Sequence, residues 1–250
     1  NYLGLHKKHS LNYSHYSVSF YSPNQSDNNN GRDSMRVLQQ DQLAVKYLLP
    51  EDTRVAASLL YQAYHDDPIL RAMLMAKKEQ DYEAKLRALI REELVSFGQG
   101  QQPIVGLFEG SNLVATACVF EAQSNLQASR YWHWRLRLMM SAGYLQTQQL
   151  IEKEDTIRLA LSEYGHYYFL AFIAVDPHIQ GQGLGHYLLA GLDDLVVTND
   201  AASGMAVFVT KIEQKAFFAS HGYQSVKTLC FNKVNGELMF KKKITDITEE

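Results

Sequence analysis

Residues 167–189 read YYFLAFIAVDPHIQGQGLGHYLL and divide into three parts. Residues 167–175 are apolar almost throughout, which is typical of a strand covered on both faces of a sheet. Three glycines at alternate positions follow, and apolar residues then recur at helical spacing up to about residue 197. The stretch therefore predicts a buried strand, a glycine-rich loop and an amphipathic helix.

The loop Gln180-Gly181-Gln182-Gly183-Leu184-Gly185 has the features of an anion-binding site. Glycines leave the backbone uncrowded, so successive N–H groups can converge on an anion at the positive end of the helix. A diphosphate suits this arrangement, because charge-assisted hydrogen bonds contribute about 1.5–3 kcal/mol each without any Lys or Arg. Neither a dinucleotide-binding G-x-G-x-x-G nor a P-loop can be drawn here. The alternative is a glycine-rich turn that binds no ligand.

The segment from Leu170 to Leu189 resembles motif A of the GNAT superfamily of acyl-CoA N-acyltransferases. That motif is a strand ending in Val-x-Pro, then Gln/Arg-x-x-Gly-x-Gly/Ala, then a helix. Its three defining positions are occupied by Gln180, Gly183 and Gly185. Downstream, AFFASHGY at 216–223 is similar to the family's closing segment. Upstream, AYHDDP at 63–68 is similar to the branch that includes puromycin N-acetyltransferase. The resemblance covers about residues 37–243.

The resemblance implies an N-acetyltransferase with acetyl-CoA as cosubstrate, acting by direct attack of an amine of a small molecule or peptide. The pantetheine arm would lie where the central strand splays, against the backbone of Phe172, Ile173, Ala174 and Val175. The diphosphate would lie on Gln180, Gly181, Gln182, Gly183, Leu184, Gly185 and His186. Phe218 stands where the family has a Tyr that protonates the departing thiolate. Because Phe218 has no proton to give, a non-catalytic acyl-CoA-binding regulatory module is the competing hypothesis.

Amide formation requires a base, because an alkylamine is protonated at pH 7 and removing its proton costs about 4–5 kcal/mol. The central strand carries no carboxylate after its start. The candidate bases are Glu121 at the end of its strand, Glu163, and His166 directly before the central strand. An imidazole titrates near neutral pH without tuning, which favours His166. For each of them, a solvated or capping role is the alternative.

Three residues are candidates for binding the acceptor amine. Trp132 and Trp134 could line a pocket for an apolar or aromatic amine, although aromatic residues at helical spacing are often part of a core. Asp66, next to Asp67, could attract a cationic amine. The alternative for this acidic pair is helix capping and turn formation before Pro68.

The flanking periodicity predicts strands at 44–48, 103–109, 113–120 and 205–210, with two last strands joined by a turn at Asn235-Gly236. Helices are expected from Pro50 to a break at Asp66-Asp67-Pro68, from that break to about residue 98, and at 126–164, 183–197 and 213–221. This order predicts an α/β fold. We expect a single mixed, mostly antiparallel sheet, splayed at the central strand, with helices on both faces.

Residues 1–34 are rich in Asn, Ser, His and Tyr and sustain no apolar period. They are predicted to form a polar tail, flexible or docked, that precedes a GNAT-like domain at 35–250.

Composition excludes several classes of protein. The 250 residues carry a net charge of −3, so no basic surface indicates nucleic acid. No uncharged apolar stretch approaches the ~20 residues that cross a bilayer, and the N-terminus lacks the apolar core of a signal peptide. Neither of the two cysteines has metal-ligand spacing to another Cys or His, so no metal is predicted. We expect a cytoplasmic monomer or homodimer without membrane or nucleic-acid partners.

Overall fold

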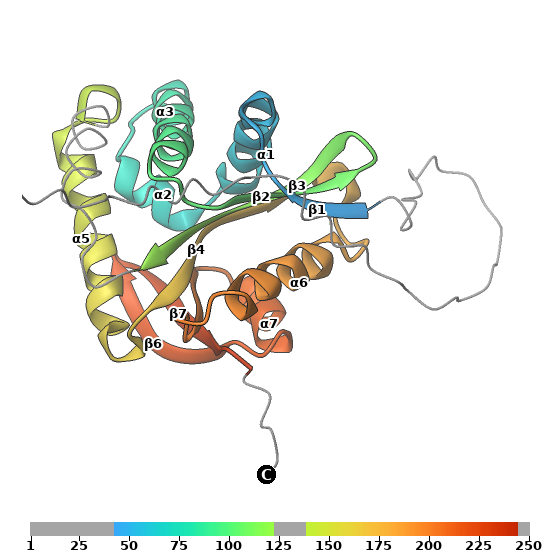
Figure 1. Cartoon of the computed structure of the whole chain (residues 1–250). Helices are drawn as coiled ribbons and strands as arrows, with labels where there is room; N and C mark the ends of the chain where they lie inside the picture. Colours follow the sequence, from blue (N-terminus) through green and yellow to red (C-terminus); the bar gives the residue numbers. More distant parts are fainter. Residues whose placement is uncertain (1–42, 123–138, 245–250) are drawn as a thin grey trace, which may run out of the picture.

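The computed structural model describes residues 43–122 and 139–244. Expectations for residues 1–34, the boundary at 35, Trp132 and Trp134 lie outside these ranges. Seven strands form one sheet in the order β1-β2-β3-β4-β5-β7-β6, in which only β4 and β5 are parallel (Figure 1). The strands are β1 (Leu43–Tyr47), β2 (Ile104–Glu109), β3 (Asn112–Ala122), β4 (Tyr167–Val175), β5 (Gly204–Val209), β6 (Gln224–Phe231) and β7 (Val234–Lys242).

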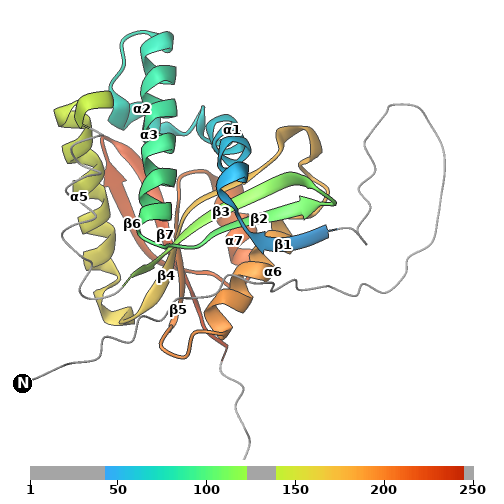
Figure 2. The same cartoon turned by 45° about the horizontal axis from the view of Figure 1, so that its top comes forward.

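Helices cover both faces of the sheet, as predicted. Figures 1 and 2 show α1, α2 and α3 on one face, with α5 beside them along β6, and α6 and α7 on the other face. The helices are α1 (Thr53–Tyr64), α2 (Pro68–Leu74), α3 (Glu79–Gln99), α5 (Tyr144–Ala160), α6 (Leu184–Val197) and α7 (Ile212–Ser220), with short 3₁₀ turns at η2 (Pro50–Asp52), η3 (Ser162–Tyr164) and η4 (Pro177–Ile179). No helix in the described ranges is both long and apolar enough to cross a membrane.

The central strand β4 changes its pairing along its length. It pairs with β3 from Tyr167 to Val175, but with β5 only from Tyr168 to Leu170. Its register against β3 steps from Leu170 to Phe172, which leaves Ala171 as a bulge. The predicted splay, which is the separation of β4 from β5 after Leu170, is therefore confirmed. Because the bulge adds one residue to β4, the alternation of side chains between the two faces of the sheet is reversed after Ala171.

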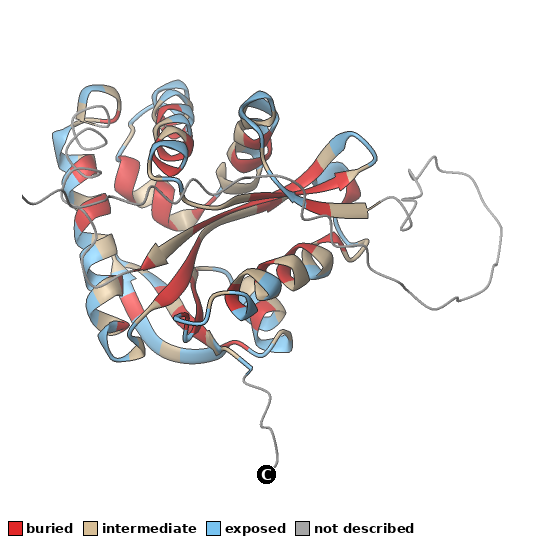
Figure 3. Cartoon of the chain, viewed as in Figure 1, coloured by how far each residue is buried: buried red, intermediate tan, exposed pale blue. Residues whose placement is uncertain are grey.

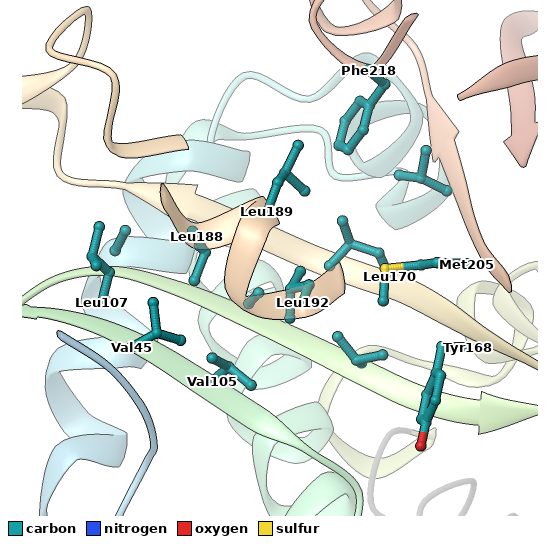
Figure 4. Packing of buried hydrophobic residues seen from close by; sticks show 14 of the residues in the cluster. Val45, Val105, Leu107, Tyr168, Leu170, Leu188, Leu189, Leu192, Met205 and Phe218 are labelled. Carbon is teal, nitrogen blue, oxygen red and sulfur yellow. The ribbon is translucent and has the colours of Figure 1, made fainter. Parts of the chain in front are cut away.

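The core divides along the two faces of β4. Tyr168 and Leu170 pack against α6 in a cluster that also contains Leu188, Leu189 and Leu192 (Figure 4). Tyr167 and Phe169 lie on the other face, in a second cluster with α5. Figure 3 shows that the middle of β3, residues 114–119, and the first half of β4 are buried, as expected for strands covered on both sides.

The break between α1 and α2 follows from Asp67-Pro68. Pro68 occupies the first turn of α2, where its missing N–H is not needed. The Asp67 side chain caps that helix by accepting a 2.9 Å hydrogen bond from the Leu70 N–H. The predicted break at Asp66-Asp67-Pro68 is therefore confirmed, and the helical region predicted after it is two helices, because α3 begins separately at Glu79.

The last hairpin turns at Asn232-Lys233, and the prediction of a turn at Asn235-Gly236 is wrong. Asn232 and Lys233 have φ values of 47° and 67°, and Phe231 pairs with Val234. Asn can adopt this left-handed conformation more readily than most residues, which allows the turn to form three residues early. Gly236 is inside β7, where an added Cβ would lie 2.2 Å from Cζ of Phe208. Close packing, and not a turn, accounts for this glycine.

Candidate functional site

The splay exposes backbone groups at the end of β4. In an antiparallel ladder, alternate residues direct both N–H and C=O toward the partner strand. The Ile173 N–H donates to the Tyr64 hydroxyl at 3.1 Å, and the Val175 C=O accepts from the Gln180 side chain at 3.1 Å, so both residues face away from β3. Of the four predicted pantetheine-binding residues, only Ile173 and Val175 thus have backbone groups in the gap.

Two of those backbone groups remain available. Among the described residues, the Val175 N–H and the Ile173 C=O form no hydrogen bond. They lie on the same edge of β4 and offer one donor and one acceptor. An amide-containing chain lying along this edge could use both, as an added strand does.

The glycine loop is held to the same end of β4. The hydrogen bond from Gln180 Nε2 to Val175 O fixes the loop where the strand ends. Gly183 precedes α6 with φ 81°, a left-handed conformation that a residue with a Cβ adopts at a cost. Gly185 has a different role, because an added Cβ there would lie 3.0 Å from the Phe217 ring of α7. The three glycines therefore do not serve one purpose.

Free N–H groups converge in this loop. In the part of the chain that the structure describes, the backbone N–H groups of residues 181–185 donate no hydrogen bond, whereas the His186 N–H donates to Gly183 O at 2.9 Å. These N–H groups stand at the positive end of α6. The loop therefore has free donors for an anion, and the His186 N–H is not one of them.

A cavity of about 110 Å³ lies on the opposite face of β4, between the sheet, α3 and α5. Its walls carry seven aromatic side chains: Tyr64, Phe97, Phe120, Tyr167, Phe169, Phe172 and Phe208. Tyr64 and Phe172 line the cavity at the splayed end of β4, where their rings meet edge to face at 5.2 Å between centroids. The cavity and the open edge of β4 therefore meet at Tyr64.

The cavity also contains charged groups. Asp67 is 8% exposed, and its Oδ2 accepts a hydrogen bond from the Thr210 hydroxyl at 3.2 Å. Glu93, which is 9% exposed, and Lys153 are also in the lining. Burial lowers the pKa of the Lys153 ammonium, and the Asp67 carboxylate acts in the opposite direction. The lining thus combines aromatic surface with three carboxylates, Asp67, Glu93 and Glu154, and two basic groups, Lys153 and Arg158; this excess of carboxylates suits a ligand that is apolar with a cationic end.

The Tyr64 hydroxyl lies at the splay, where it is bonded to the Ile173 N–H. Burial raises its pKa well above the usual value of a phenol, so it remains protonated at neutral pH. Its oxygen accepts from the Ile173 N–H, and its own hydrogen has no acceptor among the described residues. Tyr64 can therefore donate a proton or a hydrogen bond into the space between cavity and splay.

Phe218 lies in the core below the splay. It is 3% exposed, belongs to the cluster on the α6 face with Leu188 and Leu189, and contacts the Tyr223 ring at 5.1 Å (Figure 4). Burial raises the pKa of the Tyr223 hydroxyl, so this neighbour is also kept neutral. Phe218 thus contributes apolar packing.

Glu121 and His166 come together, with Glu121 Oε1 2.8 Å from His166 Nε2. Asn199 at the end of α6 donates to the same Glu121 oxygen and to the Tyr168 hydroxyl, both at 2.9 Å. This cluster is at the start of β4. Seven residues of strand separate His166 from Ile173, which corresponds to roughly 23 Å. Because Tyr168 points to the α6 face, the sheet separates the cluster from the cavity. The pair that we considered as bases is therefore close together but far from the splay.

Two other candidate residues lie on the surface. Asp66 is 78% exposed at its side chain and pairs with Arg71 at 3.0 Å, outside the cavity lining. Glu163 is exposed in the turn η3 before β4. The neighbour Asp67, not Asp66, enters the cavity, because its position as the N-cap of α2 turns its side chain inward.

No protein-family model matches the sequence, and a search of curated proteins finds no match. Solved structures do match in shape. A Corynebacterium glutamicum protein named for histone acetyltransferase and related acetyltransferases has a TM-score of 0.59 at 16% identity, over 82% of this chain and 98% of its own. An agmatine N-acetyltransferase gives 0.56 at 15%, over 81% and 100%. An arylalkylamine N-acetyltransferase of Aedes aegypti gives 0.55 at 10%, over 81% and 99%.

The chain has the GNAT fold. The structural likeness shows the fold, whereas membership of the superfamily named from motif A and of its puromycin N-acetyltransferase branch stays a prediction. Within this GNAT fold, the residues that sequence reasoning missed are Tyr64, Glu93 and Lys153. They come from helices far from motif A in the sequence. The only signal for Tyr64 was its place in the AYHDDP segment.

Proposed function

We propose that the protein is an acetyl-CoA-dependent N-acyltransferase that acetylates the amine of a small molecule or peptide. One observation carries the proposal: the free edge of β4 at Ile173 and Val175, the unpaired N–H groups of 181–185 and the charged aromatic cavity all meet at the splay. A diphosphate on the loop and a pantetheine chain along β4 would bring a thioester to Tyr64. The cavity would present an amine from the other side.

The cavity lining indicates the class of acceptor. An amine that enters as an ammonium ion would place its charge beside the buried carboxylate of Asp67, while its apolar body contacts the aromatic walls. The neighbours named for arylalkylamine and agmatine act on amines of this kind. We propose a small alkylamine or arylalkylamine as acceptor.

We propose that Asp67 receives the ammonium proton, because it is a carboxylate in the cavity close to the splay. The amine would then attack the thioester carbonyl, the C–S bond would break and the thiolate would leave with a proton from the Tyr64 hydroxyl, while the remaining excess proton of the nitrogen would pass to the Tyr64 oxygen. Tyr64 would thus take the role for which Phe218 has no hydroxyl. Acid–base catalysis of this kind contributes about 10²–10⁴-fold.

Calorimetry with acetyl-CoA, followed by measurement of free coenzyme A release with a panel of amines, tests this function. We expect binding and faster release with alkylamines or arylalkylamines than without an amine. Binding without release for any amine would favour the non-catalytic acyl-CoA-binding module, which the buried Phe218 supports. Absence of acetyl-CoA binding would overturn both.

A further inference from the structure

The cofactor loop lies in a segment without permanent positive charge. Residues 167–210 contain no Lys and no Arg, although the diphosphate proposed to bind here carries two negative charges. The loop itself provides neutral N–H groups. The side chains in or beside it that can become cationic are imidazoles, and two of them are in contact.

His186 and His221 form a hydrogen-bonded pair. His186 is in the first turn of α6, and His221 directly follows α7. His186 Nδ1 is 2.6 Å from His221 Nε2, and the two ring centroids are 4.5 Å apart. The Phe217 ring packs against both imidazoles. The pair thus joins the end of α7 to the helix that begins at the glycine loop.

The hydrogen bonds determine which nitrogen can take a proton. His221 Nδ1 is 2.8 Å from Phe217 O, and because a carbonyl oxygen only accepts, that nitrogen carries hydrogen. The Ser220 hydroxyl, 3.3 Å from the same nitrogen, donates to Phe217 O at 2.7 Å. In the neutral ring His221 Nε2 must therefore accept from His186 Nδ1–H. His186 Nε2 is left with its lone pair, and His186 is exposed.

No fixed charge competes with this pair. In the described ranges no carboxylate forms an ion pair with either imidazole. The charged residues nearest on the two helices are paired elsewhere, Lys215 with Glu237 and Asp193 with Lys241. Two protons on the pair are disfavoured, since two cations would stand 2.6 Å apart. The pair can thus hold one additional proton, which His221 stabilises by accepting from the imidazolium.

We infer that His186 and His221 act as one proton-accepting unit that becomes cationic when a diphosphate occupies the 181–185 loop. The proton comes from solvent and adds to His186 Nε2, which leaves the Nδ1–H···Nε2 bond in place. The cation then supplies the positive charge that the segment lacks. This inference rests on the proposed function, because it needs coenzyme A at the loop.

Calorimetry measures the number of protons that the protein takes up when the ligand binds. 3′-Dephospho-coenzyme A is titrated into the full chain between about pH 6 and about pH 8.5 in buffers of different ionisation enthalpy, because it lacks the phosphate monoester that itself titrates near pH 6. We expect an uptake that reaches about 0.3–1 proton per site. We also expect the affinity to fall about tenfold from pH 6 to pH 8, because the anion is held more tightly when the pair carries the additional proton.

Two variants and one control decide the result. His186→Gln should abolish the uptake and most of the pH dependence, and His221→Phe, which removes the acceptor of the His186 Nδ1–H, should reduce both, with unchanged melting temperature in the absence of ligand. His178→Gln, in the exposed turn η4 before the loop, should behave as the parent. Uptake that persists in both variants, or that His178→Gln also removes, overturns the inference. If the parent does not bind 3′-dephospho-coenzyme A or coenzyme A at all, the proposed function itself fails.

Discussion

The two faces of β4 are assembled in different ways. On the α6 face, the loop, its left-handed Gly183 and the first turn of α6 come from one continuous stretch that follows β4. On the other face, the cavity draws Tyr64 from α1, Glu93 from α3 and Lys153 from α5. Local sequence dictates the first site, whereas the packing of distant helices creates the second.

The two faces of β4 should therefore have different functional roles. The loop offers backbone N–H groups, which any sequence with the right glycines can provide. The cavity offers side chains, whose type and position set the acceptor. Cofactor binding and catalysis should therefore respond to separate substitutions, and four predictions test this separation.

The largest effect is expected on the loop side. Gly183→Asp should weaken acetyl-CoA binding more than about 100-fold, because the new carboxylate repels the diphosphate and a loss of roughly 3 kcal/mol corresponds to that factor. Gly165→Asp is the matched control, since Gly165 also has a positive φ, of 64°, but is exposed at the start of β4. Calorimetry on both variants checks the prediction; equal affinity of the Gly183 variant and the parent would contradict it.

On the cavity side, Asp67→Asn should lower kcat by about 10²-fold or more while acetyl-CoA affinity changes less than about threefold. The amide keeps an oxygen for the Leu70 N–H cap but cannot receive the ammonium proton. Steady-state kinetics with the best amine of the panel, together with calorimetry, measure both values. Asp66→Asn provides the control, because Asp66 is on the surface. The prediction fails if the two variants behave alike.

Tyr64→Phe should reduce kcat by about 10- to 100-fold, since water can partly replace the lost hydroxyl as proton donor. The same variant frees the Ile173 N–H, so acetyl-CoA affinity should hold or rise slightly. Tyr61→Phe on the same helix is the matched control. Its ring contacts His65 and Arg87 and does not line the cavity. An unchanged kcat in Tyr64→Phe would remove Tyr64 from the mechanism.

The smallest effect on turnover is expected at the start of β4. Glu121→Gln should change kcat less than about threefold, because the sheet separates Glu121 from the cavity. It should lower stability by about 1 kcal/mol through its weakened contacts with His166 and Asn199. Thermal unfolding and steady-state kinetics test both parts. A loss of kcat as large as in Asp67→Asn would contradict the prediction and would indicate that Glu121 and His166 take part in catalysis.

Much of the fold could be read from local pattern. The apolar run at 167–175 and the glycines after it specify a buried strand and a tight entry to α6, because period and backbone freedom act over a few residues. The hairpin position could not be read in this way. Asn235-Gly236 is a favoured turn sequence, but Gly236 is required beside the Phe208 ring, a contact with a different strand.

The sequence by itself therefore determined the order of elements, the central strand and the loop with donors for an anion. Only the tertiary structure decided which polar residues meet. It turned Asp67 inward and left Asp66 outside, separated Glu121 and His166 from the splay, and joined His186 to His221 across 35 positions. The physical reason is that a side chain's role depends on the face of β4 to which it points, and the bulge at Ala171 and the packing of the helices set that face.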